Sequence, residues 1–192
     1  TLGGGGSSVI LVPDKKDLNK EQVKRQMAQW VAESTGVKHP GREWVYDGMP
    51  HRIIAEKYIS SNQETGGLVD YKFFCFGGKF EYLYVIADRV LGQGAGFGIY
   101  DCTYHKLDVV RCDEQPLKRD VPKPEAFDEM VEIAEMLARP FPEVRVDLFY
   151  QDGKIYFGEM TFFDGSGYMK FDPDEFDFQL GGFFQLPQNI KT

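Results

Sequence analysis

The feature that most constrains the fold is a stretch near the C-terminal end in which apolar and polar residues alternate on both sides of an Asp-Gly pair. Alternation of this kind is typical of half-buried strands, which are predicted at residues 144–150 and 154–162. An Asp-Gly pair between two such runs is a strong local signal for a β-hairpin. The chain is therefore predicted to contain antiparallel sheet, and the hairpin register decides which side chains share a face.

Two registers are open for this hairpin. A two-residue turn at Asp152-Gly153 would place Asp147 and Glu159 on opposite faces of the sheet. A three-residue turn, with the glycine in the left-handed conformation, would pair Arg145 with Glu159. We favour the three-residue turn, because the two-residue turn would bury Glu159 among apolar side chains. The apolar face would then comprise Val144, Val146, Leu148, Tyr150, Tyr156, Met160 and Phe162.

The opposite face of the hairpin then carries Arg145, Asp147, Glu159 and Thr161. Asp147 and Glu159 would be diagonal neighbours about 7–8 Å apart at the backbone, so their carboxylates could share a cation. A structural ion-pair cluster is the commoner explanation for such a group. The alternative is a magnesium site, since Mg²⁺ takes carboxylate oxygens together with substrate phosphates. Arg145 would then stabilise charge on a transferred phosphoryl group. Spacing alone leaves both readings open.

The rest of the chain predicts a mixture of helices and strands. Helices are expected from Asp17 to Gly36 and over residues 125–138, where apolar residues recur on one side. Residues 70–76 and 80–87 predict a second hairpin around Gly77-Gly78. Further strand-like segments lie at residues 9–12, 52–59, 97–101 and 107–111, of which 52–59 is expected to be buried and 97–101 to pair with 107–111. The glycine-rich residues 92–98 are expected to form a loop.

Composition narrows the function classes. The 192 residues are 42% apolar, which predicts a folded globular protein. The 22 basic and 30 acidic residues give a net charge of −8, which disfavours a nucleic-acid partner or an anionic membrane. No run approaches the roughly 20 apolar residues of a membrane span, so no membrane insertion is expected. Three cysteines without a CxxC pair favour buried free thiols and a cytoplasmic location.

Several segments together are similar to one known family. The strongest are Val144-Arg145-Val146-Asp147-Leu148, Ile155-Tyr156-Phe157-Gly158-Glu159 and Gly165-Ser166-Gly167, with weaker ones at residues 41–46, 52–59, 70–76 and 100–104. In order and spacing they cover nearly the whole chain and resemble the ATP-grasp enzymes, most closely the TupA-like family of teichuronopeptide biosynthesis. This resemblance implies an α+β fold of two lobes, with a central antiparallel sheet flanked by helices. Residues 1–57 would form a small lobe with a glycine-rich loop, residues 58–192 a larger lobe with the metal site, and the nucleotide would bind between them.

The resemblance also implies a reaction. The family suggests an ATP- and Mg²⁺-dependent carboxylate-amine ligase that forms an acyl phosphate, in cell-surface polysaccharide or peptidyl-polymer biosynthesis. By resemblance, Asp147 and Glu159 would hold Mg²⁺ against the phosphates, with Thr161 where many relatives place a further ligand, an Asn. Arg145 would be the catalytic residue of the acyl-phosphate site. Nucleotide contacts would come from Glu56, Lys57, Tyr58 and Ile59 at the adenine, Asp70 at the ribose, and Lys72, Gly5, Gly6 and Ser7 at the phosphates.

The N-terminal end departs from the family pattern. Relatives carry an upstream region and a Lys before a His-Gly-Ser-Gly-Gly-like loop, whereas this chain starts at Thr1 and its loop, Gly3 to Ser8, has neither His nor Lys. The loop also has the composition of an artificial linker. We therefore expect a partner or an absent N-terminal region to complete the site. Two other functions stay open: a glycosyltransferase, for which Asp172-Pro173-Asp174 imitates a metal motif, and a degenerate nucleotide-binding module without catalysis.

Overall fold

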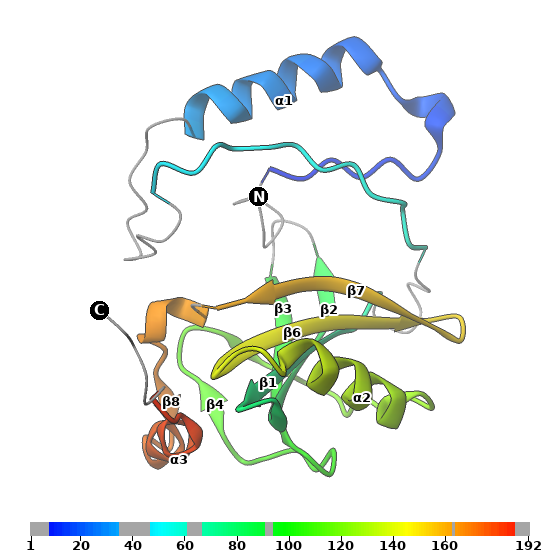
Figure 1. Ribbon diagram of the computed structural model, residues 1–192. Coiled ribbons are helices and arrows are strands. Elements are labelled where there is room, and N and C mark those ends of the chain that lie inside the picture. Colours follow the sequence, from blue (N-terminus) through cyan, green and yellow to red (C-terminus); the bar gives the residue numbers. More distant parts are fainter. Residues whose placement is uncertain (1–7, 35–46, 61–66, 91–93, 163, 187–192) are drawn as a thin grey trace. The chain divides into compact units, whose positions relative to one another are not determined.

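The computed structural model describes residues 8–34, 47–60, 67–90, 94–162 and 164–186. The chain divides into two compact units, Thr1–Ser60 and Ser61–Thr192, and each is considered by itself (Figure 1). The mixture of helices with a largely antiparallel sheet confirms the predicted α+β class. Within the described residues, no helix combines the length and apolar character needed to cross a membrane.

The first unit contains a short 3₁₀ helix, η1 (Lys15–Asp17), and the helix α1 (Lys20–Ser34). The side chain of Asp14 accepts a hydrogen bond from the backbone of Lys16 and so caps η1. Oδ1 of Asn19 accepts a hydrogen bond from the backbone N–H of Gln22 at 3.0 Å and begins α1. The helix predicted from Asp17 is therefore confirmed, but it starts three residues later because η1 comes first.

Two strand predictions in the first unit are wrong. Residues 9–12 and 52–59 belong to no strand, and no strand occurs among this unit's described residues. A strand needs a neighbour for its backbone N–H and C=O groups, and neither run has a ladder partner there. The 52–59 segment is also not buried, since the exposed fraction is 60% for Ile54 and 40% for Tyr58. The apolar run therefore predicted a strand, but no neighbouring strand is present among the described residues of this unit to pair with it.

The second unit is built on a six-stranded sheet of order β5-β3-β2-β1-β6-β7, in which only β3 and β5 pair in parallel. Its strands are β1 (Asp70–Phe76), β2 (Lys79–Val90), β3 (Gly94–Asp101), β5 (Gln115–Pro116), β6 (Glu143–Gln151) and β7 (Lys154–Thr161). A two-stranded sheet pairs β4 (Val110–Arg111) with β8 (Phe171–Asp172). The helices are α2 (Phe127–Ala138) and α3 (Glu175–Phe183), with a 3₁₀ segment, η4 (Asp164–Gly167), after β7.

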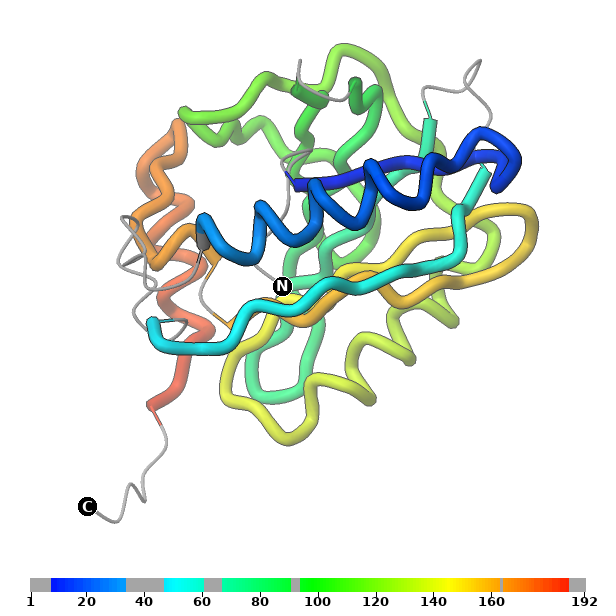
Figure 2. The backbone as a smooth tube through the Cα atoms, turned by 90° about the horizontal axis from the view of Figure 1, so that it is seen from above, coloured from blue at the N-terminus to red at the C-terminus, as the bar shows by residue number. Residues whose placement is uncertain are grey.

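The two faces of the sheet are covered differently (Figures 1 and 2). Helix α2 packs on one face, where Met130 and Ala134 are fully buried in a core with Phe73, Leu83 and Val146. The other face carries a second core at one end, where Phe171 and Phe176 of the β8 and α3 region pack with aromatic and aliphatic sheet residues. The charged residues of the candidate site lie on this second face, on strands β1, β6 and β7.

The turn of the β6–β7 hairpin differs from our prediction. Gln151 pairs with Lys154, so the turn has two residues, Asp152 and Gly153, both with positive φ (52° and 71°). Two successive residues of positive φ fit the twist of the flanking strands, which is why Asp-Gly favours this turn. The predicted three-residue turn is therefore wrong. The face prediction built on it is partly wrong too, because Ile155 and not Tyr156 joins the core on the α2 side.

A β-bulge then brings Asp147 and Glu159 back to the same face of the sheet, at the end of the hairpin away from the turn. The register shifts between Leu148, which pairs with Phe157, and Asp147, which pairs with Glu159, so that Gly158 is the extra residue. A Cβ on Gly158 would lie 3.0 Å from the carbonyl oxygen of Asp147. The glycine therefore permits the close approach, and Asp147 and Glu159 become direct cross-strand partners on one face instead of diagonal neighbours.

Other strand and cysteine predictions need correction. Strand β3 begins at Gly94, where a loop was expected, because Gly96 and Gly98 leave room for the side chain of Leu117. The predicted pairing of residues 97–101 with 107–111 is confirmed only at its start, where Leu107 donates a backbone hydrogen bond to Ile99 at 2.8 Å, whereas residues 110–111 pair with β8. Of the cysteines, Cys75 is buried as predicted, whereas Cys102 and Cys112 are exposed.

Candidate functional site

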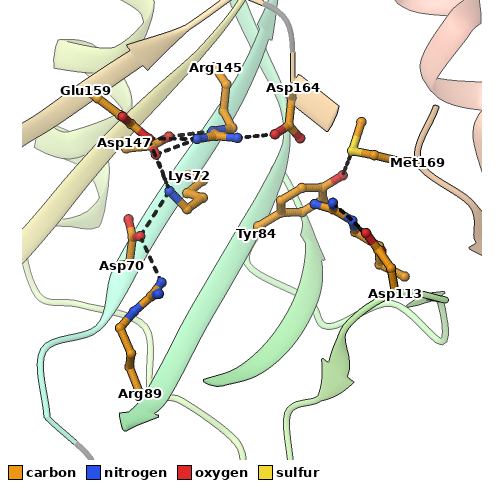
Figure 3. A network of polar contacts seen from close by, with 11 residues as sticks. Asp70, Lys72, Tyr84, Arg89, Asp113, Arg145, Asp147, Glu159, Asp164 and Met169 are labelled. Atoms are coloured by element: carbon orange, nitrogen blue, oxygen red, sulfur yellow. Dashed lines mark hydrogen bonds and ion pairs between the residues drawn. The ribbon is translucent and has the colours of Figure 1, made fainter. Parts of the chain in front are cut away.

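Three neighbouring strands bring the predicted site residues of the second unit together. Lys72 on β1 lies opposite Asp147 on β6, and Glu159 on β7 lies opposite Asp147 from the other side. Because residues at i and i+2 of a strand share a face, Asp70 and Arg145 lie on the same side of the sheet. Figure 3 shows these side chains joined in one continuous network of ion pairs.

Arg145 is the centre of this network. Its Nε donates to Oδ1 of Asp147 at 2.7 Å and its Nη2 to Oδ2 at 2.8 Å, a bidentate pair. Nη2 also donates to Oε1 of Glu159 at 3.1 Å, and Nη1 to Oδ1 of Asp164. Burial by itself would lower the pKa of Arg145, but Asp147 and the other carboxylates outweigh burial and raise it. A permanently charged guanidinium, 7% exposed, is thus held among three acids.

Lys72 links the network to β1. Its ammonium Nζ lies 3.0 Å from Oδ2 of Asp70 and forms an ion pair with Oδ2 of Asp147. Oε1 of Glu159 is 3.9 Å from the same nitrogen. Arg89, at the end of β2, lies 3.7 Å from Oδ2 of Asp70. The lysine side chain is only 12% exposed, so these charges act with little screening by water.

The carboxylates of the network differ in their titration. Burial opposes ionisation of Asp147, yet the hydrogen bond from Arg145 and the charge of Lys72 hold its pKa below the ordinary value. Burial is the main cause that raises the pKa of Asp70, and the nearby charge of Asp147 adds to it. The pKa of Glu159 is raised by burial and by Asp147. Asp147 is therefore the carboxylate that ionises most readily, and it lies between Asp70 and Glu159, which lose their protons less readily than usual.

The donor set fits a divalent cation. Four carboxylates, on Asp70, Asp147, Glu159 and Asp164, face the two buried cations Lys72 and Arg145, with Arg89 beside Asp70 as a third cation. The acidic groups therefore still outnumber the basic ones. Oδ1 of Asp70 and Oδ2 of Asp164 are buried without a hydrogen-bond partner. Among the described residues, no three His, Cys, Asp or Glu side chains form a ready-made metal cluster. Mg²⁺ requires less than that, because it retains waters and takes phosphate oxygens beside one or two carboxylates.

The remaining predicted residues lie elsewhere. Thr161 is opposite Arg145 on β7, on the face of the network. The adenine segment belongs to the first unit, where Glu56, Lys57 and Tyr58 are exposed and Ile59 is partly buried. The loop residues Gly5, Gly6 and Ser7 lie outside the described residues.

Sequence reasoning missed three charged residues at or near this site. Asp164 follows β7 and reaches Arg145 from η4, and Arg89 reaches Asp70 from the end of β2. Neither contact follows from strand alternation, because both side chains lie at or beyond strand ends. Glu143 could have been found, since it precedes Arg145 by two residues and shares its face. Burial, together with the charge of Asp164, raises the pKa of Glu143 from 4.5 to about 7.

Comparison with known proteins gives a match to one family model. No curated protein and no solved structure gives a significant match to the chain. A family model described as TupA-like ATPgrasp matches residues 1–185 of the 192. The match covers both units and all the residues of the ion-pair network. Because it spans nearly the whole sequence, the chain belongs to the TupA-like ATP-grasp family.

Proposed function

We propose that the protein is an ATP- and Mg²⁺-dependent ligase that joins a carboxylate to an amine, in the biosynthesis of a cell-surface polysaccharide or peptidyl polymer. One observation supports this most: a buried guanidinium and a buried ammonium lie beside the facing pair Asp147 and Glu159. Cations for phosphate and carboxylates for a metal are what phosphoryl transfer requires of a protein.

Four residues of the network have a role in this proposal. Asp147 and Glu159 would hold Mg²⁺, and Glu159, with a side chain 62% exposed, is the ligand open to an incoming nucleotide. The bound Mg²⁺ would neutralise charge on phosphate oxygens. Lys72 and Arg145 are at present occupied by carboxylates. When those carboxylates turn toward a cation, both side chains can donate to phosphate oxygens.

The proposed reaction has two steps. In the first, a substrate carboxylate oxygen attacks the γ-phosphorus of ATP, the bond to the β-phosphate oxygen breaks, and ADP and an acyl phosphate form. In the second, the amine nitrogen attacks the acyl carbon, the carbon–oxygen bond to phosphate breaks, and inorganic phosphate leaves. An amine that binds as an ammonium first loses one proton to solvent or to a nearby carboxylate, which frees the lone pair for the attack. The nitrogen loses a second proton in the same way as the amide forms. Arg145 would stabilise the charge that develops on the phosphoryl oxygens in both steps.

Thermal stabilisation by nucleotide tests the proposal. We expect ATP to raise the melting temperature of the full chain only when Mg²⁺ is present, since a ligand stabilises the state that it binds. Glu159→Gln removes a metal ligand that is largely exposed, so the variant should fold and lose the Mg²⁺-dependent part of the shift. Glu129→Gln on α2, an exposed carboxylate on the opposite side of the sheet, is the matched control. An equal shift in wild type and Glu159→Gln would contradict the metal assignment.

A further inference from the structure

A pocket of about 290 Å³ lies wholly within the second unit, close to the ion-pair network. Its apolar wall comes from β1, from the segments between β7 and β8, and from α3 with the residue after it. The side chains are Phe74, Phe76, Phe162, Met169, Leu180 and Phe184. A cavity of this size and lining suits a small organic molecule. The ion-pair network uses none of these apolar side chains, so the pocket is available to a separate ligand.

The charged side chains of this pocket have one sign. Glu143, Asp164 and Asp177 line it, and among the described residues that form its walls there is no lysine or arginine. The Asp164 side chain is 10% exposed, and its Oδ1 accepts from Arg145. Its Oδ2 is buried without a hydrogen-bond partner, and Figure 3 shows this oxygen turned away from the guanidinium. A buried carboxylate oxygen without a donor lowers stability until a donor reaches it.

These features select the chemistry of the occupant. An anion would be repelled by Asp164 and Asp177, and above pH 7 by Glu143 as well. A neutral apolar molecule would leave Oδ2 of Asp164 without a donor. An organic ammonium is attracted by the carboxylates, and its N–H groups can donate to Oδ2 of Asp164. Aromatic faces also attract a cation. An apolar body attached to the ammonium would fill the wall formed by the phenylalanines.

We propose that this pocket binds the amine substrate as an organic ammonium with an apolar body, its nitrogen directed at Asp164. The assignment of the ammonium as substrate rests on the proposed ligase function. Asp164 connects the two sites, since one of its oxygens contacts Arg145 and its side chain lines the pocket. An amine held there lies next to the guanidinium assigned to the acyl phosphate.

Binding of three matched probes to the nucleotide-free full chain tests the pocket. The probes are phenethylammonium, the neutral 2-phenylethanol and the anionic 3-phenylpropanoate, and their affinities are measured by calorimetry. We expect the ammonium to bind at least tenfold more tightly than the alcohol, and the carboxylate not to bind. Equal binding of the ammonium and the alcohol would overturn the proposal.

Two variants and NMR shift perturbations locate the ammonium-binding site. The measurement is made at pH 8, above the Glu143 pKa of about 7. There Asp164→Asn and Glu143→Gln each remove a charge and keep the shape of the side chain, so each should weaken ammonium binding at least threefold. Glu129→Gln on α2 should leave ammonium affinity unchanged. Should Asp164→Asn fail to fold, NMR shift perturbations in the wild type keep the test decisive, because they must centre on Glu143 and residues 164–184. Perturbations elsewhere would overturn the assignment.

Nucleotide binding is measured in parallel, so the two proposals can fail separately. Ammonium binding without Mg²⁺-dependent nucleotide stabilisation would support the pocket and contradict the ligase. Nucleotide stabilisation without ammonium binding would support the ligase and contradict the pocket.

Discussion

At the residue scale, the two proposed metal ligands differ in how much of the fold depends on them. Asp147 is 1% exposed and accepts hydrogen bonds from Arg145 and Lys72, whereas the Glu159 side chain is 62% exposed. Removing one member of a buried network leaves its partners' charges uncompensated. The same chemical change at the two positions should therefore separate structure from ligand binding.

We expect Asp147→Asn to lower the free energy of unfolding by about 3–5 kcal/mol, as for other broken buried ion pairs. Glu159→Gln should change it by less than about 1 kcal/mol, because an exposed pair contributes little. Denaturant unfolding monitored by circular dichroism measures both values. Equal losses of stability would show that the exposure of Glu159 does not reflect its contribution to the fold.

Glu143 should make stability depend on pH. Its pKa is raised from 4.5 to about 7 by burial and by Asp164, while Arg145 opposes the increase. Between these values the folded chain retains a proton that the unfolded chain has lost, so stability decreases as the pH rises. Glu143→Gln removes this loss, and its stability relative to wild type should increase by on the order of 2–3 kcal/mol from pH 5 to pH 8. Parallel stability profiles of the two proteins over this range would contradict the expectation.

At the scale of the element, the bulge in β7 aligns the site. Gly158 lets β7 approach β6, and the resulting shift pairs Asp147 with Glu159. Without the shift, the two-residue turn would put these carboxylates on opposite faces, because one residue of slip reverses every side chain. The hairpin turn therefore sets the register near Gln151, and the bulge shifts that register by one residue before Asp147 and Glu159 are reached.

Gly158→Ala should disturb that alignment. The added Cβ would lie 3.0 Å from the carbonyl oxygen of Asp147 and 3.0 Å from a ring carbon of Phe149. We expect a loss of about 1–3 kcal/mol of stability, typical of overpacking, together with a smaller Mg²⁺-dependent nucleotide shift. Gly182→Ala in α3 is the control, because nothing lies within 4 Å of its added Cβ. A Gly158→Ala variant as stable as wild type would show that the bulge tolerates a side chain.

At the scale of the whole molecule, the two units differ in how their backbone groups are satisfied. The second unit pairs most of its strands in one sheet, whereas residues 52–59 of the first pair with no strand among the residues that the structure describes. Amides without a ladder exchange quickly with solvent. The adenine-contact prediction for residues 56–59 can therefore be tested by an added ligand.

Hydrogen exchange should show fast exchange over residues 52–59 in the free protein and slow exchange in β1 and β6. Addition of Mg²⁺ and ATP should slow exchange at Glu56, Lys57, Tyr58 and Ile59 if their backbone borders the adenine. Unchanged exchange in this segment, with stabilisation of the second unit by nucleotide, would exclude it from the nucleotide site.

Local pattern in the sequence was sufficient for several elements. The spacing of apolar residues predicted α1 and α2, and the paired glycines Gly77 and Gly78 predicted the hairpin of β1 and β2. The resemblance to the family, carried by ordered motifs along the chain, predicted the fold that the family match bears out. These features depend on neighbours within a few residues, or on motifs that can be read directly.

Tertiary structure alone decided the register and the site partners. The sequence predicted that Arg145, Asp147 and Glu159 share a face, but it did so through a turn that does not form. Packing around Gly158 produces that face by a bulge, which alternation cannot reveal. Asp164 joins Arg145 from a segment beyond the last strand of the sheet. Whether the apolar run 52–59 finds a strand partner also depends on distant parts of the chain, because hydrogen bonds between strands are contacts that periodicity does not encode.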